Sequence, residues 1–173
     1  MNKAELALRK SIIEACRAMN SLGINQGTSG NISARFEERM LITPTSVPYD
    51  ELSPGDIMAT PIAGDGTAWT GPLSPSSEWR FHLSILQKRP EIGAVVHTHS
   101  TSRVSRLRRR ICAGVSELMR CMDTGGSVSV LDPVARLSPV DPERQVLAHD
   151  PEAALLVVRD VRADVRGDEH SGR

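Results

Sequence analysis

The sequence predicts an α/β fold, in which helices and short strands alternate along the chain. Three segments predict it: residues 4–20 and 77–88 have helical character, and residues 92–96 form an apolar run typical of a buried strand. Short apolar runs separated by turn-rich segments lie between the two helical segments. The amino-terminal part of the chain therefore contains both kinds of element.

The first helix is predicted by apolar residues at helical spacing, with basic residues falling largely on other faces. The apolar residues are Leu8, Ile12, Ala15, Cys16 and Met19. This pattern is typical of an amphipathic helix over residues 4–20 that packs one face against a core. Gly23 is expected to end it, because glycine readily adopts the left-handed conformation that follows many helices.

Three short strands are predicted after this helix. Residues 32–36 alternate as a strand does, residues 40–43 form a short apolar strand ended by Pro44, and residues 56–60 are a weaker candidate. Residues 25–31 form a glycine and hydroxyl cluster directly before the first of these strands. We therefore expect this cluster to be a loop at a strand entrance.

A helix start is predicted at residues 75–78, Pro-Ser-Ser-Glu. Serine side chains can cap unpaired amides, and an acidic side chain suits the positive end of the helix dipole. The helix is expected over residues 77–88, and the buried strand 92–96 then runs directly into His97, Thr98 and His99.

Length and composition limit the classes of protein to which the chain can belong. A chain of 173 residues fits one domain, and 21 basic residues against 21 acidic residues predict no field that attracts nucleic acid or a membrane surface. Cys16, Cys112 and Cys121 are too few and too scattered for a disulfide framework, which favours the cytoplasm. No apolar stretch is long enough for a membrane span. The expected partner is a small molecule.

The composition changes beyond about residue 102. Residues 102–173 contain roughly a dozen arginines, no lysine and no aromatic residue. The runs 128–131 and 153–158 fit either strands or helix fragments. The basic run 106–110 is expected to be a solvated face, because no aromatic side chains interleave for base stacking.

Two histidines are the most specific local signal for chemistry. Side chains alternate along a strand, so His97 and His99 are expected to project to the same side, where two imidazoles can hold one metal ion. The alternative is a pair of histidines at a partly exposed strand end. Glu78, in the first turn of the preceding helix, is expected to reach this site and act as the acid/base. The alternative for Glu78 is a capping role.

Hydroxyl and amide groups near this site predict phosphate binding. Ser76 and Ser77 offer hydroxyls and helix-start amides, and residues 28–31 offer hydroxyls, a glycine that allows close backbone approach and an amide side chain. Together these two segments are predicted to hold a phosphate. His82 lies four residues after Glu78, but we expect it to be a packed or hydrogen-bonded histidine outside the site.

The chain resembles the class II aldolase/adducin family over about residues 1–101. Four motifs carry the resemblance in the family's order, namely residues 27–33 (GTSGNIS), 41–45 (LITPT), 75–82 (PSSEWRFH) and 89–100 (RPE through HTHS). It implies a three-layer α/β/α sandwich with a largely antiparallel central sheet. It also implies Zn²⁺ held by His97 and His99, about one ion per subunit, with Glu78 as the acid/base and a homotetramer or other homo-oligomer. The phosphate-binding positions that it implies are Thr28, Asn31, Ser76 and Ser77.

The resemblance implies a zinc-dependent aldolase that cleaves a ketose 1-phosphate, similar to L-fuculose 1-phosphate, to dihydroxyacetone phosphate and an aldehyde. The alternatives are a family dehydratase or decarboxylase on another sugar phosphate, and an inactive truncated or adducin-like binding protein. Ser46 departs from the family, in which a glycine approaches the phosphate. The family's third histidine ligand has no counterpart in its usual context, since His149 and His170 are the only later histidines.

The abrupt end of the resemblance predicts a divergent or frameshifted tail over residues 102–173, to which no separate domain is assigned. An arginine-rich segment without aromatic residues is typical of a shifted reading frame in a GC-rich gene. If the tail is frameshifted, we expect it to supply none of the remaining sheet strands.

Overall fold

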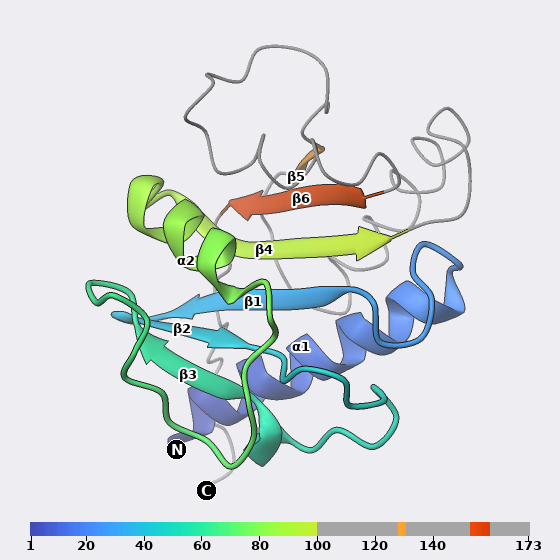
Figure 1. Ribbon diagram of the computed structural model, residues 1–173, viewed down its shortest axis with the longest axis horizontal. Helices are drawn as coiled ribbons and strands as arrows, with labels where there is room; N and C mark the ends of the chain where they lie inside the picture. The colour runs from blue at the N-terminus through green and yellow to red at the C-terminus, as the bar shows by residue number, and fades with distance from the viewer. Residues whose placement is uncertain (100–127, 131–152, 160–173) are drawn as a thin grey trace, which may run out of the picture.

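The structure is a computed structural model that describes residues 1–99, 128–130 and 153–159. A six-stranded sheet in the order β3-β2-β1-β4-β6-β5 forms its centre, and all neighbouring strands are antiparallel (Figure 1). The predicted α/β fold is confirmed. The elements are α1 (Lys3–Ser21), β1 (Asn31–Phe36), β2 (Arg39–Ile42), the 3₁₀ turn η1 (Pro54–Asp56), β3 (Met58–Pro61), α2 (Trp79–Lys88), β4 (Ile92–His99), β5 (Val128–Val130) and β6 (Ala153–Arg159).

The two helices lie on opposite faces of the sheet (Figure 1). On one face, α1 packs against alternate strand residues such as Ile32, Ala34 and Val96. On the other face, α2 packs against residues of the opposite parity, including Val95. Each strand therefore contributes side chains to two hydrophobic clusters, and this division positions the polar side chains that share the α2 face.

The first helix has the predicted extent and stop. It covers Lys3–Ser21, and Asn2 caps it by accepting a hydrogen bond from the amide of Glu5 at 2.8 Å. Gly23 follows with a φ of 66°. This is the left-handed conformation that glycine adopts without a steric penalty, so the expected role of Gly23 is confirmed.

Strand boundaries differ slightly from the prediction. β1 and β2 form a hairpin in which Phe36 pairs with Arg39, close to the predicted strands 32–36 and 40–43. The third strand begins at Met58 and not at residue 56, because residues 54–56 form a 3₁₀ turn. Asp56 closes this turn by accepting a hydrogen bond from the amide of Ser53 at 2.8 Å.

The second helix begins later than predicted. It covers Trp79–Lys88, so Glu78 is the residue before the helix and not part of its first turn. The Glu78 side chain makes no capping hydrogen bond to the helix. Ser76 does accept a hydrogen bond from the Glu78 amide, at 3.4 Å. The carboxylate of Glu78 thus remains available for other contacts.

Two strands from the tail continue the sheet. β6 pairs with β4 from Ile92 to His99, and β5 pairs with β6. The expectation that a frameshifted tail supplies no strands is therefore wrong, and residues 128–130 and 153–159 form strands. The basic run 106–110, His149 and His170 lie outside the described residues. None of the described helices is long and apolar enough to cross a membrane.

Candidate active site

The candidate site lies where β1, β4 and the start of α2 meet. Asn31 opens β1 and pairs in register with His97 of β4. The two side chains share the α2 face of the sheet with Ser33 and Val95, because side chains alternate along each strand. Glu78 approaches this face from the residue before α2. Residues far apart in the sequence are thus brought to one place.

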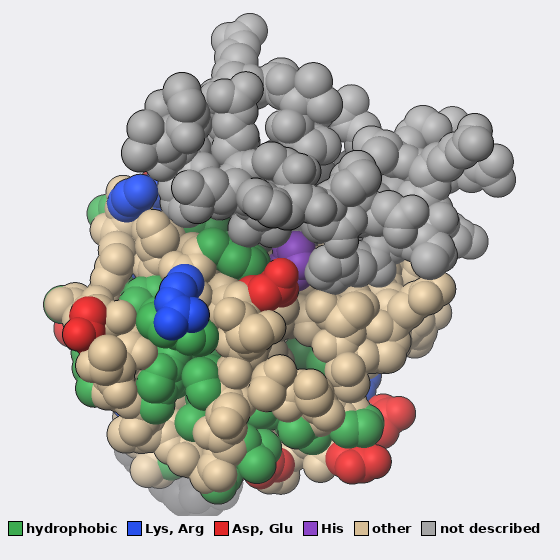
Figure 2. Space-filling view, viewed as in Figure 1, with side chains coloured by type: hydrophobic (Ala, Val, Ile, Leu, Met, Phe, Trp, Pro, Cys, Tyr) green, Lys and Arg blue, Asp and Glu red, His purple; other side chains and the backbone are tan. Residues whose placement is uncertain are grey.

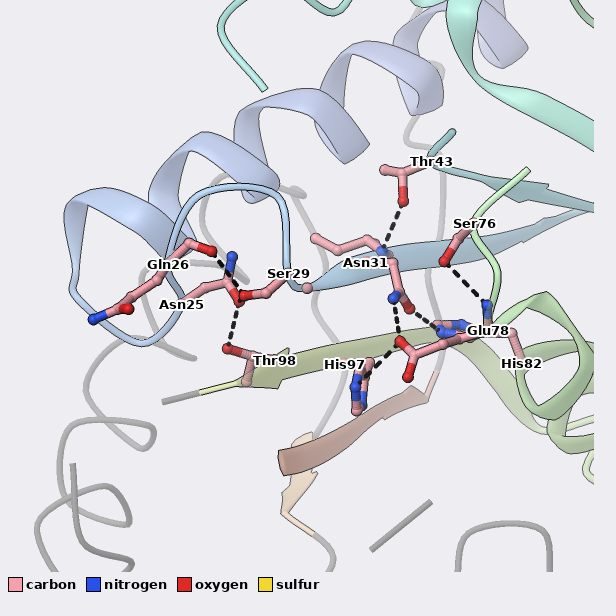
Figure 3. A network of polar contacts seen from close by, with 12 residues as sticks. Asn25, Gln26, Ser29, Asn31, Thr43, Ser76, Glu78, His82, His97 and Thr98 are labelled. Atoms are coloured by element: carbon pink, nitrogen blue, oxygen red, sulfur yellow. Dashed lines mark hydrogen bonds and ion pairs between the residues drawn. The ribbon is translucent and has the colours of Figure 1, made fainter. Parts of the chain in front are cut away.

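The Glu78 carboxylate connects these elements (Figure 3). Its Oε2 accepts a hydrogen bond from Asn31 Nδ2 at 2.5 Å and lies 3.2 Å from His97 Nε2. The His97 side chain is fully buried, whereas about a third of the Glu78 side chain, 32%, is exposed. The carboxylate therefore has one oxygen held by buried polar groups and a side chain that solvent or a ligand can still reach.

A pocket of about 270 Å³ opens beside this carboxylate. Hydroxyl and amide side chains dominate its lining, as expected for a site that binds an anion through hydrogen bonds. The lining residues are Thr28, Ser29, Gly30, Asn31, Pro44, Thr45, Ser46, Ser76, Ser77 and Glu78. All four predicted phosphate-binding residues, Thr28, Asn31, Ser76 and Ser77, are among them.

Backbone pairing explains why separate motifs line one pocket. The segment that follows β2 lies against the segment that precedes α2: Ser76 N donates to Thr43 O at 3.0 Å, and Thr45 N donates to Ser74 O at 3.0 Å. This short ladder fixes the hydroxyl-rich ends of both segments next to each other. Thr45 was not predicted as a pocket residue, although a threonine directly after a strand-ending proline was available as a signal.

The loop before β1 is braced from several sides. A Cβ at Gly30 would lie 2.7 Å from both Asn25 Oδ1 and His97 O, so this close approach of backbones requires glycine. Tyr49 donates a hydrogen bond to Gly30 O at 2.5 Å, and burial raises the pKa of Tyr49. Thr98 donates to Ile24 O. These contacts hold the loop that carries Thr28 against β4.

His82 is fully buried and hydrogen-bonded, as the sequence predicts. Its Nδ1 lies 2.7 Å from Ser33 Oγ, and its Nε2 lies 2.5 Å from Asn31 Oδ1. Burial, and secondarily the nearby His97, hold the pKa of His82 well below its ordinary value. His82 therefore carries a neutral ring at physiological pH.

The described donors fit part of a zinc site. His97 Nε2 and Glu78 Oε2 face each other at 3.2 Å, and imidazole and carboxylate are ligand types that zinc accepts. His99 lies two positions further along β4, but its side chain lies outside the described ones. Within the described residues, no group of three His, Cys, Asp or Glu side chains is placed to hold a metal ion.

Ser46 lines the pocket in an unusual backbone conformation. Its φ of 59° lies in the left-handed region, which glycine adopts more readily than residues with a side chain. The position at which the chain departs from the family's glycine is therefore one at which the backbone favours glycine.

The outer face over α2 carries mixed side chains. In the space-filling view, hydrophobic side chains gather over the lower part, and single acidic and basic side chains are spread among them (Figure 2). On the described part of this face, no broad region has a single charge.

Part of the chain is similar in sequence to known sugar-phosphate aldolases. A 5-methylthioribulose-1-phosphate/5-deoxyribulose-1-phosphate aldolase from Rhodospirillum rubrum is 47% identical over 100 residues, which is 58% of this chain and 44% of the relative. An L-fuculose phosphate aldolase from Escherichia coli is 48% identical over 108 residues, 61% of this chain and 49% of the relative. The chain thus spans about half the length of these relatives.

The solved structure of YgbL from Escherichia coli shares the fold, with a TM-score of 0.60 at 21% identity over 93% of this chain and 83% of that one. Residues 10–105 match the profile described as the Class II Aldolase and Adducin N-terminal domain. The chain belongs to the class II aldolase and adducin family.

Proposed function

We propose that this chain is a zinc-dependent aldolase that reversibly cleaves a ketose 1-phosphate to dihydroxyacetone phosphate and an aldehyde. The observation that carries the proposal is the position of Glu78, whose carboxylate lies between the hydroxyl-lined pocket and the buried His97. The names of the relatives support a sugar phosphate as the substrate. One relative is named for two sugar 1-phosphates, and the other is named for L-fuculose phosphate.

The substrate phosphate would bind in the pocket beside Glu78. Thr28, Ser76 and Ser77 offer hydroxyls, and the second amide hydrogen of Asn31 Nδ2 remains for a ligand after the first is donated to Glu78. A phosphate accepts several hydrogen bonds, so a lining of donors suits it without a basic side chain. The pocket volume of about 270 Å³ is sufficient for a phosphate group and the first atoms of the sugar.

Glu78 would move the proton that accompanies cleavage of the carbon–carbon bond. Its Oε2 is held by Asn31, whereas Oε1 makes no hydrogen bond with another described residue. A general base needs this combination of a fixed position and an accessible oxygen. His97 and His99 would hold zinc, which would stabilise the negative charge that develops on the substrate oxygens during cleavage.

Further features of the proposal rest on the family resemblance. We propose that the full chain forms the three-layer sandwich of the family, with residues 1–101 as the family-like region and 102–173 as a divergent or frameshifted tail. We also propose that it works in the cytoplasm as a homo-oligomer.

The experiment is a turnover assay on the full chain. Protein purified with added zinc is given L-fuculose 1-phosphate or 5-deoxyribulose 1-phosphate, and release of dihydroxyacetone phosphate is followed by a coupled NADH-dependent reduction. Release that is lost with a chelator and restored by zinc supports the proposal. Loss of water or carbon dioxide without release of dihydroxyacetone phosphate would favour a dehydratase or decarboxylase, and no reaction at all would favour an adducin-like binding protein.

A further inference from the structure

We infer that Ser33 and His82 are positioning residues that orient the Asn31 amide toward Glu78, an inference that rests on the proposed function of Glu78. The four side chains form one chain of contacts. Ser33 Oγ lies 2.7 Å from His82 Nδ1. His82 Nε2 lies 2.5 Å from Asn31 Oδ1, and Asn31 Nδ2 lies 2.5 Å from Glu78 Oε2; Figure 3 shows these last three side chains together.

The direction of the hydrogen bonds follows from the chemistry of each group. Asn31 Oδ1 can only accept, so His82 Nε2 carries the proton and donates to it. The neutral ring then has an unprotonated Nδ1, which accepts from the hydroxyl of Ser33. In this series of hydrogen bonds, every donor therefore points from the interior toward the carboxylate of Glu78.

This direction fixes the orientation of the Asn31 amide. An amide rotated by half a turn would place Nδ2 against the N–H of His82 and Oδ1 against the carboxylate of Glu78. Two donors would then face each other, and two acceptors would face each other. Because His82 is fully buried, solvent cannot pair with these groups, so only the observed orientation is compatible with both the Glu78 carboxylate and a ring protonated at Nε2.

The consequence is a fixed Glu78 oxygen. Glu78 is exposed by about a third, 32%, and makes no capping hydrogen bond to α2, so its own element does not hold its side chain. The contact from Asn31 supplies that constraint, and His82 supplies the constraint on Asn31. A side chain that sets the geometry of a reacting group through one intermediate typically affects turnover without touching the substrate.

Ser33 lies in β1 two positions after Asn31, on the same face of the strand. Its side chain is fully buried, as is that of His82 in α2. The pair is thus isolated from the pocket, whose lining includes neither residue. Their effect on a bound substrate must therefore act through Asn31.

The test uses nuclear magnetic resonance on the full chain, so it does not depend on turnover. Nitrogen-15 correlations of the ring should show His82 protonated at Nε2 only. Relaxation of the Asn31 side-chain amide should show high order in the unmodified chain and in His82→Gln, whose amide can still donate to Asn31 Oδ1. It should show a mobile amide in His82→Leu, which cannot donate. Ser33→Ala should shift the Nδ1 resonance of His82, because Nδ1 loses the hydrogen bond that it accepts.

The matched control is Leu83→Ala, which removes packing from the same helix at a neighbouring buried position. It should leave the Asn31 amide ordered. In turnover assays, His82→Leu should lower kcat by about 10- to 100-fold with a small effect on KM, and His82→Gln should recover most of the loss.

A ring protonated at Nδ1, or an Asn31 amide equally ordered in His82→Leu, would overturn the inference, as would a kcat loss in Leu83→Ala as large as that in His82→Leu. An unchanged Nδ1 resonance in Ser33→Ala would remove Ser33 from this series of contacts. If the unmodified protein turns over no substrate, the proposed function is wrong, and the two resonance measurements alone decide whether His82 orients Asn31.

Discussion

Asn31 and Glu78 are 47 positions apart in the sequence, yet Asn31 Nδ2 and Glu78 Oε2 lie within 2.5 Å of each other. The contact exists because β1 begins, and α2 begins, at the same end of the sheet. It joins a residue of the hydroxyl-lined pocket to the carboxylate that we propose moves the proton. Binding and catalysis would therefore share one side chain, and disturbance of Asn31 should affect both.

Replacing Glu78 with glutamine should abolish cleavage while sparing the fold. Glutamine keeps an oxygen that can accept from Asn31, but it cannot take a proton, so kcat should fall by about 100- to 10,000-fold. The matched control is Glu51→Gln, an exposed carboxylate away from the pocket. Steady-state assays with circular dichroism on both variants measure the effect. Normal turnover in Glu78→Gln would remove Glu78 from the mechanism.

Metal content gives an independent check. We expect about one zinc per chain after dialysis against metal-free buffer, and a much lower content in His97→Ala, because imidazole is a principal zinc ligand. Elemental analysis by mass spectrometry measures both. His82→Gln is the control, because both ring nitrogens of His82 already contact other side chains, those of Ser33 and Asn31. This variant should leave the zinc content unchanged. Equal zinc in His97→Ala would place the metal elsewhere.

Ser46→Gly should strengthen substrate binding in the pocket and so lower the KM. The φ of 59° at Ser46 is unfavourable for a residue with a side chain, by roughly 1 kcal/mol, and part of this strain is offset by the greater freedom of glycine in the unfolded chain. Removal of the side chain should also let a phosphate approach the backbone, so KM should fall. Ser46→Ala keeps the strained Cβ and serves as the control. Identical KM values in the two variants would show that only the hydroxyl matters.

The elements that the sequence predicts well are those with a strong local pattern. The helix over residues 4–20 has apolar residues at helical spacing and a glycine stop, and the structure places α1 at Lys3–Ser21. The first residue of α2 was harder to predict, because two serines and a glutamate in a row can each precede a helix. Backbone pairing of Ser76 with Thr43, which no local pattern reports, helps to fix where that helix begins.

The residues of the candidate site also differ in whether a local sequence pattern predicts them. Glu78, Asn31 and the pocket serines could be proposed from residue type and motif. The role of Ser33 could not, because strand alternation places it on one face of β1 without saying which helix covers that face. The partnership of Ser33 with His82 depends on the packing of α2 over β1, which is a tertiary property. The sequence left strands and helix fragments open for the runs 128–131 and 153–158, because pairing with β4 and not local composition places β6 in the sheet.

The frameshift hypothesis for residues 102–173 is tested by the coding DNA. A second reading frame downstream of about codon 102 should encode the rest of a family-like sequence, including Asn-His-Gly, the usual context of the family's third histidine ligand. Sequencing of the gene and translation of all three frames decides this. Absence of any family-like sequence in the other frames would show that the tail is a divergent segment.

Cys16 should resist modification in the folded protein. Its side chain is fully buried, and burial raises the pKa of the thiol, so the reactive thiolate is scarce and inaccessible. Alkylation at neutral pH followed by peptide mass spectrometry should leave Cys16 unlabelled until denaturant is added. Rapid labelling without denaturant would mean that α1 does not pack against the sheet as described.

A buried ion cluster should make stability depend on acid pH. Glu5 accepts hydrogen bonds from Arg9 at 2.7 Å and from Arg39 at 2.9 Å, and its side chain is only 6% exposed. Burial raises the pKa of Glu5, but the hydrogen bonds and charges of Arg39 and Arg9 together hold it below its ordinary value of 4.5.

Because the folded pKa of Glu5 is the lower one, the ionised carboxylate contributes its full stability above a pH of about 4.5, and this contribution is lost as the pH falls through the folded pKa. Glu5→Gln should lower the free energy of unfolding at neutral pH by about 3 kcal/mol, since it leaves two arginines without their carboxylate. Glu14→Gln, on the exposed face of the same helix, is the control. Denaturant titrations at a series of pH values measure all three proteins. The gap between the unmodified chain and Glu5→Gln should narrow as the pH falls, and a constant gap would mean that the carboxylate stabilises the fold through packing and not through its charge.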